Sequence, residues 1–237
     1  MGRYSQFRRD GYVVVPNALD AAELALLRGT CATLLDEPVD DGGDGRHKIG
    51  LGQDRRFLSH RHEEFPELAE FVLGPTMAQF AASVLGEDSL LFNEQFVVKG
   101  PKTGASFAWH QDGFYVGYDH KPYVTVWIAL DDTTIENGCV YIQPRDLNAK
   151  AGLDPHVWLA DTAEYNGYDG DDPGKAMECP AGTIVMFSSE TLHRSGRNVT
   201  DQPRRAYICQ YSPEPIRDPD TGALKRFAKP LASPVMV

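Results

Sequence analysis

The stretch YVTVWIALDD, residues 123–132, decides the fold class of this chain. It is an almost unbroken apolar run of β-branched and aromatic residues that ends in two aspartates, which is typical of a short strand buried in a protein core. Similar runs, separated by turn residues, recur after Gly86: SLLFNEQFVVKG (89–100), GCVYIQP (138–144), GTIVMFSS (182–189) and RRAYICQYS (204–212). Short strands repeated in this way predict a β-sandwich or a β-barrel.

Helical periodicity dominates the N-terminal third of the chain. From Asp20 to Asp36, leucines recur at roughly helical spacing. The candidate N-cap of this helix is Asn17 or Asp20, and Glu23 lies three residues after Asp20, as in a capping box. This pattern predicts a first helix.

The remaining segments complete the predicted architecture. A short strand, GYVVVP (11–16), precedes the first helix, a second helical region is predicted over 66–85, and the Gly- and Asp-rich segment 36–54 predicts a loop. Helices first and strands afterwards indicate a mainly β fold with helices packed outside. The polar segment 145–178 is too long for an ordinary connection, so we expect an insert that covers a site.

Size and charge exclude several classes of protein. The 237 residues fit one large β-type domain, and the formal charge of −11 predicts repulsion of nucleic acid and of anionic lipid. No apolar run approaches the ~20 residues of a membrane span, and the N-terminus lacks the apolar core of a signal peptide. The four cysteines are widely spaced without a C-x-x-C pair, which favours free thiols. We therefore expect a cytoplasmic protein.

WHQDGFY (109–115) contains a candidate pair of metal ligands, His110 and Asp112. Side chains at i and i+2 of a strand share one face, so both could bind one ion, although a lone H-x-D also describes a histidine hydrogen-bonded to a carboxylate. A second candidate, His193, follows another apolar strand in FSSETLHRSGRN (187–198). Two imidazoles and one carboxylate form the facial triad of non-haem Fe(II) oxygenases, but the same donors also describe a catalytic zinc site.

Arginines cluster after His193 in an otherwise acidic chain, beside the hydroxyl of Ser195. They are Arg194, Arg197, Arg204 and Arg205. A guanidinium donates two parallel hydrogen bonds to a carboxylate, so an arginine near the metal is what anchoring a dicarboxylate requires. The alternative for most of them is a set of solvated turn arginines that balance nearby acids.

Four separated stretches together resemble the phytanoyl-CoA dioxygenase family of Fe(II)/2-oxoglutarate oxygenases. They are FRRDGYVVVPNALDAAEL (7–24), WHQD (109–112), VWIALDDTTIENGCVYIQP (126–144) and HRSGRNVTDQPRRAY (193–207). The resemblance implies a double-stranded β-helix, a jelly-roll and cupin-like barrel with flanking helices outside and the metal near one open end. It implies one oxygenase domain over 1–237, with helical support in 1–86, the jelly-roll core in 87–215, the insert at about 145–178 and a tail at 216–237.

The resemblance also assigns the site. The iron ligands fall on His110, Asp112 and His193. The arginine that binds the distal carboxylate of 2-oxoglutarate falls on Arg204, with Arg205 as its nearest rival. If Arg204 faces the barrel interior, strand alternation turns Arg205 outward.

Other residues match positions near the cosubstrate. Ser195 matches a hydroxyl that contacts the same carboxylate, and Trp127 matches a tryptophan beside it or is a plain core aromatic. Asn93 and Gln95 share one strand face and are candidate polar contacts to the cosubstrate. The chemistry implied uses Fe(II), 2-oxoglutarate and O2, with oxidative decarboxylation driving hydrogen abstraction from a small molecule. The carboxylate of Asp112 disfavours halogenation, because halogenating relatives have a small residue there.

Aromatic residues alternate with acids and glycines around the presumed mouth and in the insert, which suits a polar, hydroxyl-rich substrate such as a sugar or a cyclic natural product. These aromatics are Phe114, Tyr115, Tyr118, His156, Trp158, Tyr165 and Tyr168. We therefore expect tailoring of a secondary metabolite such as an oligosaccharide antibiotic, by hydroxylation or oxidative ring closure. The alternatives are an acyl-CoA hydroxylase, a zinc-dependent hydrolase on the same barrel and a non-catalytic binding module.

Two further features bear on the site. RDLNAKAG (145–152) stands where many family members have a Gly-Ser-His turn, so we expect a differently shaped barrel mouth. His60 and His62 in SHRHEE (59–64) form another H-x-H pair. We set this pair aside, because its segment lacks strand texture and the family has no ligand there.

Overall fold

The run that decides the fold class forms strand β6 (Val124–Ala129), and all of its residues are buried. Val126 and Ile128 lie in a cluster shared with the helices, whereas Trp127 lies in a second cluster between two sheets. A strand covered on both sides has no solvent face, and this is why its sequence is apolar throughout.

The computed structural model describes residues 2–39, 46–49, 55–102 and 104–233. The helices are α1 (Arg3–Asp10), α2 (Ala21–Leu35), α3 (Pro66–Leu73), α4 (Pro75–Leu85) and the short 3-10 helix η1 (Asp112–Val116). The remaining strands are β1 (Tyr12–Val15), β2 (His47–Ile49), β3 (Arg55–Ser59), β4 (Leu90–Lys99), β5 (Phe107–His110), β7 (Val140–Ile142), β8 (Val157–Leu159), β9 (Glu164–Asn166), β10 (Lys175–Ala176), β11 (Ile184–Ser188), β12 (His193–Ser195), β13 (Arg204–Ser212) and β14 (Lys229–Pro230).

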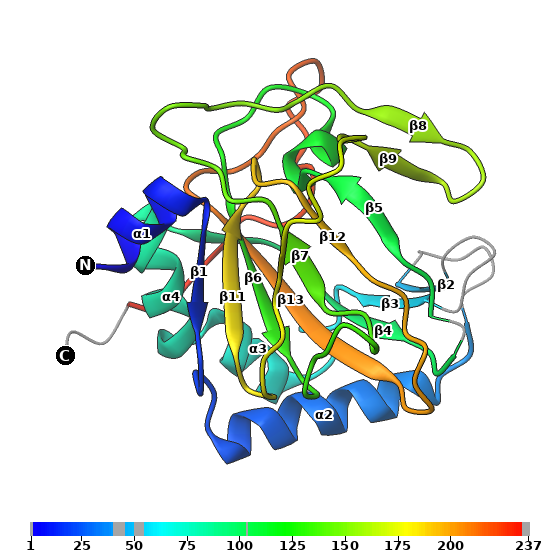
Figure 1. Cartoon of the computed structure of the whole chain (residues 1–237). Helices are drawn as coiled ribbons and strands as arrows, with labels where there is room; N and C mark the ends of the chain where they lie inside the picture. The colour runs from blue at the N-terminus through cyan, green and yellow to red at the C-terminus, as the bar shows by residue number, and fades with distance from the viewer. Residues whose placement is uncertain (1, 40–45, 50–54, 103, 234–237) are drawn as a thin grey trace.

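The strands form two main antiparallel sheets. The larger has the order β1-β11-β6-β13-β4-β3-β2, with β14 paired to β4, and the smaller has the order β10-β7-β12-β5. The helices pack on the outer face of the larger sheet, and α2 runs along one end of the barrel (Figure 1). The mainly β fold with flanking helices outside is therefore confirmed.

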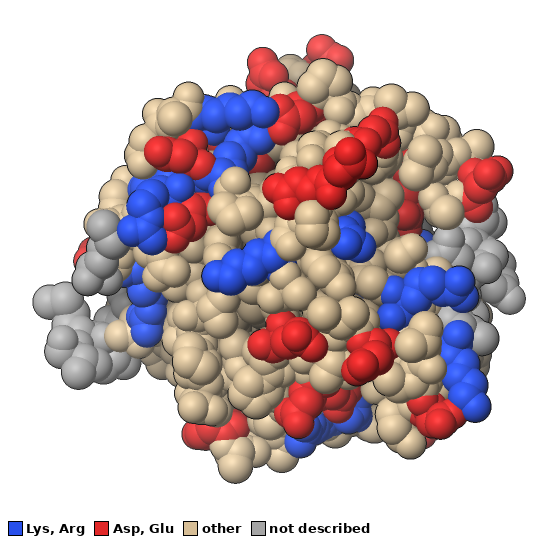
Figure 2. Space-filling model, viewed as in Figure 1, with Lys and Arg blue, Asp and Glu red and all other residues tan. Residues whose placement is uncertain are grey.

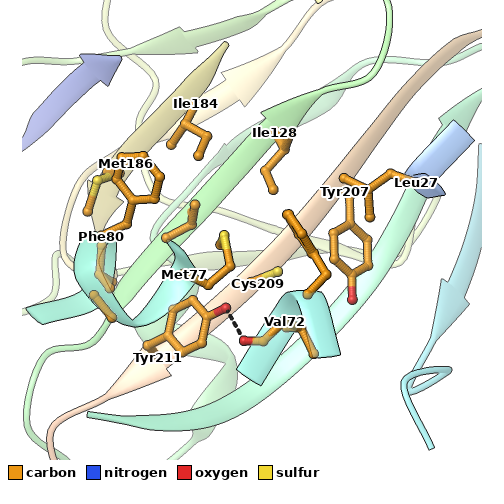
Figure 3. Packing of buried hydrophobic residues seen from close by; sticks show 14 of the residues in the cluster. Leu27, Val72, Met77, Phe80, Ile128, Ile184, Met186, Tyr207, Cys209 and Tyr211 are labelled. Atoms are coloured by element: carbon orange, nitrogen blue, oxygen red, sulfur yellow. Dashed lines mark hydrogen bonds between the residues drawn. The ribbon is translucent and has the colours of Figure 1, made fainter. Parts of the chain in front are cut away.

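The main core lies between the helices and the larger sheet. Figure 3 shows Met77 of α4 in one cluster with Ile128 of β6 and Tyr211 of β13. The hydroxyl of the fully buried Tyr211 donates to the carbonyl oxygen of Val72 at 2.8 Å. Its polar group is therefore satisfied inside an apolar layer, as burial of a tyrosine requires.

Helix α2 begins at the predicted N-cap Asp20. The Asp20 carboxylate accepts from the backbone N–H groups of Ala22 and Glu23, and the Glu23 carboxylate accepts from the N–H of Asp20. The capping box is confirmed, and Asn17 instead lies in the preceding turn with a φ of 51°.

Replacing Asp20 with alanine should lower the free energy of unfolding by about 0.5–2 kcal/mol, because two N–H groups at the start of α2 lose their acceptor. Urea denaturation followed by circular dichroism measures this difference. An unchanged unfolding midpoint would contradict the assigned cap.

The structure corrects two predictions about helices. Helix α1 was missed, since its eight residues carry only one buried side chain, Phe7. The single helical region over 66–85 is two helices, because Gly74 is extended at φ −77° and ψ 174°. Pro75 accounts for the break, since a proline disfavours helical dihedrals in the residue before it.

The segment of α3 and α4 also bears on the membrane expectation. Pro66–Leu85 spans 20 residues at a mean hydropathy of 1.3, so by length and composition alone it could cross a membrane, contrary to the expectation of no such run. However, 50% of it is buried. Core side chains such as Leu68, Phe71 and Phe80 lie against the larger sheet. This is the pattern of core helices, which pass the same test.

Two short strands were also missed. Strand β2 lies in the segment 36–54 that was predicted as a loop, and β3 ends immediately before the His60 pair. β3 pairs with β4 from Arg55 to Ser59. Its polar, non-alternating sequence gives little indication of a strand, and pairing with β4 supplies its stability. Residues 40–45 and 50–54 lie outside the described part of the chain.

The sequence composition bears on the charged side chains at the surface and on the four cysteine thiols. Acidic and basic side chains are interspersed over the face in Figure 2. All four cysteines are free, as predicted. Burial raises the pKa of Cys31 to about 12 and that of Cys139 to about 11, so these thiols stay protonated at neutral pH.

Candidate active site

The three predicted metal ligands converge at one end of the barrel. His110 ends β5, His193 begins β12, and these two residues are paired in the smaller sheet. Asp112 does not lie on the strand as predicted, because it is the first residue of η1. Gln111 between them is extended, with φ −112° and ψ 126°, and this brings the side chains of His110 and Asp112 to the same site.

The donor atoms are close enough to share an ion. Asp112 Oδ1 lies 3.6 Å from Nε2 of His110 and 3.6 Å from Nε2 of His193. Two donors each about 2.1 Å from a common ion are at most about 4.2 Å apart. Across the described part of the chain, these three residues form the one group of potential ligands whose atoms all lie within 4.8 Å of one another.

Hydrogen bonds orient both imidazoles. Nδ1–H of His110 donates to the carbonyl of Ala108 at 2.8 Å, and Nδ1–H of His193 donates to the carbonyl of Thr191 at 3.1 Å. Each ring therefore presents Nε2 to the shared point, which is how ligating histidines are usually held.

The carboxylate of Asp112 is oriented in a similar way. Its Oδ2 accepts from Thr125 Oγ1 at 2.6 Å and from Gln210 Nε2 at 3.0 Å. Gln210 in turn accepts from Asn93, which accepts from His60 Nε2 at 2.8 Å. Oδ1 is thus left free to bind a metal.

The electrostatics favour an ionised aspartate beside a neutral His193, whereas the pKa of His110, which burial lowers, is raised overall by its hydrogen bond to Asp112 and by the charge of that carboxylate. Burial alone would raise the pKa of Asp112, but the imidazoles of His193 and His110 outweigh it and hold this pKa below its usual value. Burial and the neighbouring His110 lower the pKa of His193 to about 4. A neutral imidazole and a carboxylate are the protonation states that bind a divalent metal.

An inner cavity of about 100 Å³ opens beside the triad and contains most of the predicted cosubstrate residues. Arg204, Ser195, Trp127 and Gln95 line it together with His110, Asp112 and His193. Arg204 is 1% exposed, and its Nε has no hydrogen-bond partner. The buried hydroxyl of Ser195 also has none. Buried donors without partners are rare, so these two atoms fit an absent ligand that carries acceptor oxygens.

The other arginines of the cluster have other contacts, although Arg194 is also part of the lining of the inner cavity. Arg205 forms a two-pronged ion pair with Asp131, with its Nη2 2.6 Å from Oδ1, so it does face out of the barrel. Arg194 stacks over the ring of Tyr141 at 4.0 Å, and Arg197 is exposed. Burial lowers the pKa of Arg204 to about 10, which still leaves it protonated at neutral pH.

A larger outer cavity of about 350 Å³ is lined by two of the same metal ligands, His110 and Asp112. Asn93 lines this outer cavity and not the inner one, whereas Gln95 lines both. The role of Asn93 and Gln95 as cosubstrate contacts stays a prediction. The insert contributes Thr162, Ala163 and Glu164 to the wall of this cavity.

The insert is bound directly to the metal-binding segment. Glu164 Oε2 accepts from the N–H of Ala108 at 3.1 Å, and Glu164 forms a buried ion pair with Arg55 of β3. The N–H of Gln111 donates to His156 Nε2 at 3.1 Å. The insert is therefore a fixed wall of the outer cavity. Nδ1–H of His156 donates to the backbone carbonyl of Asp154, so both ring nitrogens of His156 have hydrogen-bond partners within the protein.

The competing H-x-H pair does not form a metal site. His60 donates to Asn93, whereas Nδ1 of His62 donates to Glu94 at 3.0 Å. Asn93 and Glu94 are successive residues of β4, so they project to opposite faces. The two histidines therefore stabilise the barrel from either side of one strand.

Several site residues were missed in the sequence. Gln210 and Thr125 hold Asp112, and Arg55 and Glu164 join the insert to the barrel. Counting by two from Arg204 along β13 reaches Gln210, so its inward position could have been found. The Arg55–Glu164 pair could not, since 109 positions separate its members and neither lies in a recognised motif.

A β-barrel with a His-Asp-His facial triad at one end has the architecture of non-haem Fe(II) oxygenases. A family model described as phytanoyl-CoA dioxygenase (PhyH) matches residues 7–206. The chain is 23% identical to the phytanoyl-CoA dioxygenase domain-containing protein 1 homolog of Dictyostelium discoideum, over 87% of this chain and 89% of the relative.

Solved structures agree with this fold. The chain is similar to the epimerase SnoN in complex with Fe3+, alpha ketoglutarate and nogalamycin RO, with a TM-score of 0.72 and 24% identity, covering 98% of this chain and 94% of SnoN. It is also similar to EvdO2 of Micromonospora carbonacea var. aurantiaca complexed with 2-oxoglutarate, with a TM-score of 0.70 and 25% identity, covering 92% and 94% of the two chains. The double-stranded β-helix is therefore confirmed.

The chain belongs to the phytanoyl-CoA dioxygenase family. It is an Fe(II)/2-oxoglutarate-dependent oxygenase, with Fe(II) as cofactor and 2-oxoglutarate and O2 as cosubstrates.

Replacing Gln210 with leucine should lower the affinity for Fe(II) about ten- to hundredfold, because Asp112 loses one of the two hydrogen bonds that orient it. Anaerobic equilibrium dialysis against Fe(II) measures this affinity. The exposed Gln202, replaced in the same way, is the matched control. If both variants bind Fe(II) like the unaltered protein, Gln210 does not position the ligand.

Proposed function

We propose that this oxygenase tailors a polar small molecule of secondary metabolism by oxidising an unactivated C–H bond, through hydroxylation or oxidative ring closure. His110, Asp112 and His193 would hold the iron, which together with 2-oxoglutarate supplies the oxidising power for hydrogen abstraction. The chain as a whole, 1–237, would act as one oxygenase domain. The observation that supports the site assignment most strongly is the pair of unpartnered donors, Arg204 Nε and Ser195 Oγ, beside the triad.

In this proposal the inner cavity holds 2-oxoglutarate. Arg204 donates to the distal carboxylate from the floor of the cavity, and Ser195 donates to the same group. Trp127 forms an apolar wall, and its ring centroid lies 5.8 Å from the guanidinium carbon of Arg204. The ring therefore fixes the orientation of the guanidinium and excludes water from the ion pair.

The outer cavity is the place for the substrate. It is lined by aromatic rings, among them Phe92, Tyr115 and Tyr123, and by polar groups such as Asn93 and Gln95. A pocket with aromatic walls and convergent polar groups suits a cyclic or sugar-containing molecule. The likeness to SnoN, which comes from nogalamycin biosynthesis, supports this class.

Two measurements test the oxygenase assignment. Anaerobic addition of 2-oxoglutarate to the Fe(II)-loaded protein should produce a weak visible charge-transfer band. Tight retention of zinc without such a band would favour a zinc-dependent hydrolase.

A metabolite panel tests the substrate class. Succinate formation should rise with glycosylated or polycyclic natural products and not with fatty acyl-CoA thioesters. Stimulation by acyl-CoA alone would replace the tailoring assignment with an acyl-CoA hydroxylase.

A further inference from the structure

The outer cavity has an excess of positive charge in a chain whose formal charge is −11. Its charged lining consists of Arg55, Lys225, Arg226, Asp112 and Glu164. Arg55 is neutralised by its ion pair with Glu164, and Asp112 belongs to the metal triad. Two cations, Lys225 and Arg226, are left to face the substrate space.

Neither of these two cations forms an ion pair within the described ranges. Lys225 Nζ lies 5.5 Å from the ring centroid of Tyr118. The charge of Lys225 also acts on Asp218, whose pKa is lowered mainly by hydrogen bonds from Thr221, but the two side chains form no ion pair. Within the described residues, the positive charge of Lys225 and Arg226 is therefore not neutralised by a direct ion pair with a protein carboxylate.

The neutral polar groups of the same cavity are largely satisfied by one another. The Asn93 side chain accepts from His60 and donates to Gln210, and Gln95 Oε1 accepts from Ser59. The buried polar atoms of this wall without a hydrogen-bond partner are the hydroxyl of Thr162, Arg55 Nε and Glu164 Oε1, and this last oxygen lies in the ion pair with Arg55. The free groups of the cavity are thus donors and cations, and their complement is a ligand with anionic oxygens.

The C-terminal tail holds the two cations in place. The N–H of Lys225 donates to the carbonyl of Ile216, and the N–H of Phe227 donates to that of Phe92 in β4. The ring of Phe227 lies edge-on to both His60 and His62, with centroid distances of 5.0 and 4.8 Å. The backbone that carries Lys225 and Arg226 is therefore fixed to the barrel wall.

From this arrangement we infer that the substrate carries a carboxylate or a phosphate group, which Lys225 and Arg226 bind at the outer cavity while the rest of the molecule reaches the iron. The inference rests on the proposed function and narrows its substrate class. It also identifies the tail as a determinant of specificity, since both cations come from residues 216–237.

Matched probes that differ in charge test this inference. The Fe(II)-loaded protein, saturated with 2-oxoglutarate under anaerobic conditions so that Arg204 is occupied, is titrated calorimetrically with three pairs of compounds. They are glucuronate and glucuronamide, glucose 6-phosphate and glucose, and benzoate and benzamide. At least one anionic probe should bind about tenfold more tightly than its neutral partner. A preference for glucuronate or benzoate would indicate a carboxylate site, and a preference for glucose 6-phosphate would indicate a phosphate site.

Variants assign the preference to the two cations. In the double variant Lys225→Gln/Arg226→Gln the preference should disappear, whereas Lys121→Gln should retain it. Lys121 is the matched control, because it removes one charge from a surface pair with Glu214 and does not line the cavity. Replacing Lys225 and Arg226 with neutral glutamine should leave the core of the protein intact, and circular dichroism verifies this.

Equal binding of the members of every pair, or a preference that survives in the double variant, would overturn the inference. The assay involves no turnover, so its failure is separate from failure of the proposed function. The latter would appear as absent iron-dependent succinate formation.

Discussion

Replacing Asp112 with alanine is expected to abolish iron binding and with it all succinate formation. Removing groups that merely orient a ligand typically costs ten- to a hundredfold in metal affinity, so loss of the ligand itself should cost more than about a hundredfold. Two buried side chains, those of Thr125 and Gln210, donate hydrogen bonds to this one carboxylate and hold it in position. Iron content after gel filtration, determined by mass spectrometry, measures the effect.

The control for this variant is a carboxylate of the surface. Asp201→Ala removes the partner of Lys102, a pair whose side chains are both mainly exposed, and iron content should not change. An Asp112→Ala protein that retains stoichiometric iron would mean that the triad is not the metal site.

The structure shows why some features could be predicted from the sequence. Strand β6 was identifiable because both of its faces are buried, which makes the whole run apolar. The capping box of α2 is a local pattern, so Asp20 and Glu23 specify it without any distant partner. By contrast, β3 exists because β4 lies beside it, and its own residues give little indication of a strand.

The triad was recognisable for a related reason. His110 and Asp112 are close in sequence, His193 follows another apolar strand, and the family resemblance assigns all three as iron ligands. The geometry that brings the first two together differs from the prediction, since Asp112 starts a 3-10 turn. A single extended residue, Gln111, is sufficient to give the same relative direction as a strand.

Pairing across strands produces features that the sequence does not reveal. Arg204 on β13 is opposite Lys99 on β4, and Lys99 is opposite Arg55 on β3. All three side chains are buried, at 1%, 0% and 2% exposure respectively. Like charges directly opposite one another are destabilising. This row of cations therefore needs compensation.

The positive charges of these three residues are compensated in different ways. Burial, and then the charges of Arg204 and Arg55, lower the pKa of Lys99 well below its usual value, which favours the neutral amine. Arg55 is paired with Glu164. Among the described residues Lys99 and Arg204 have no ion pair with a carboxylate, and Arg204 is the one of these two that stays protonated and lines the inner cavity.

Replacing Arg204 with alanine should therefore leave iron binding intact but weaken 2-oxoglutarate binding by about 2–5 kcal/mol, because a buried charge-assisted pair loses one partner. This corresponds to an increase of about 30-fold to about 4000-fold in the concentration of 2-oxoglutarate needed for half-maximal formation of the charge-transfer band. Arg205→Ala is the matched control, since its guanidinium is bound to Asp131 outside the cavity and its loss should leave this concentration nearly unchanged. For Arg204→Lys, this concentration of 2-oxoglutarate should lie between those of the two alanine variants, because lysine retains the charge but lacks the paired donors of a guanidinium. If Arg204→Ala loses iron to the same extent as Asp112→Ala, Arg204 supports the metal site and some other cation must bind the cosubstrate.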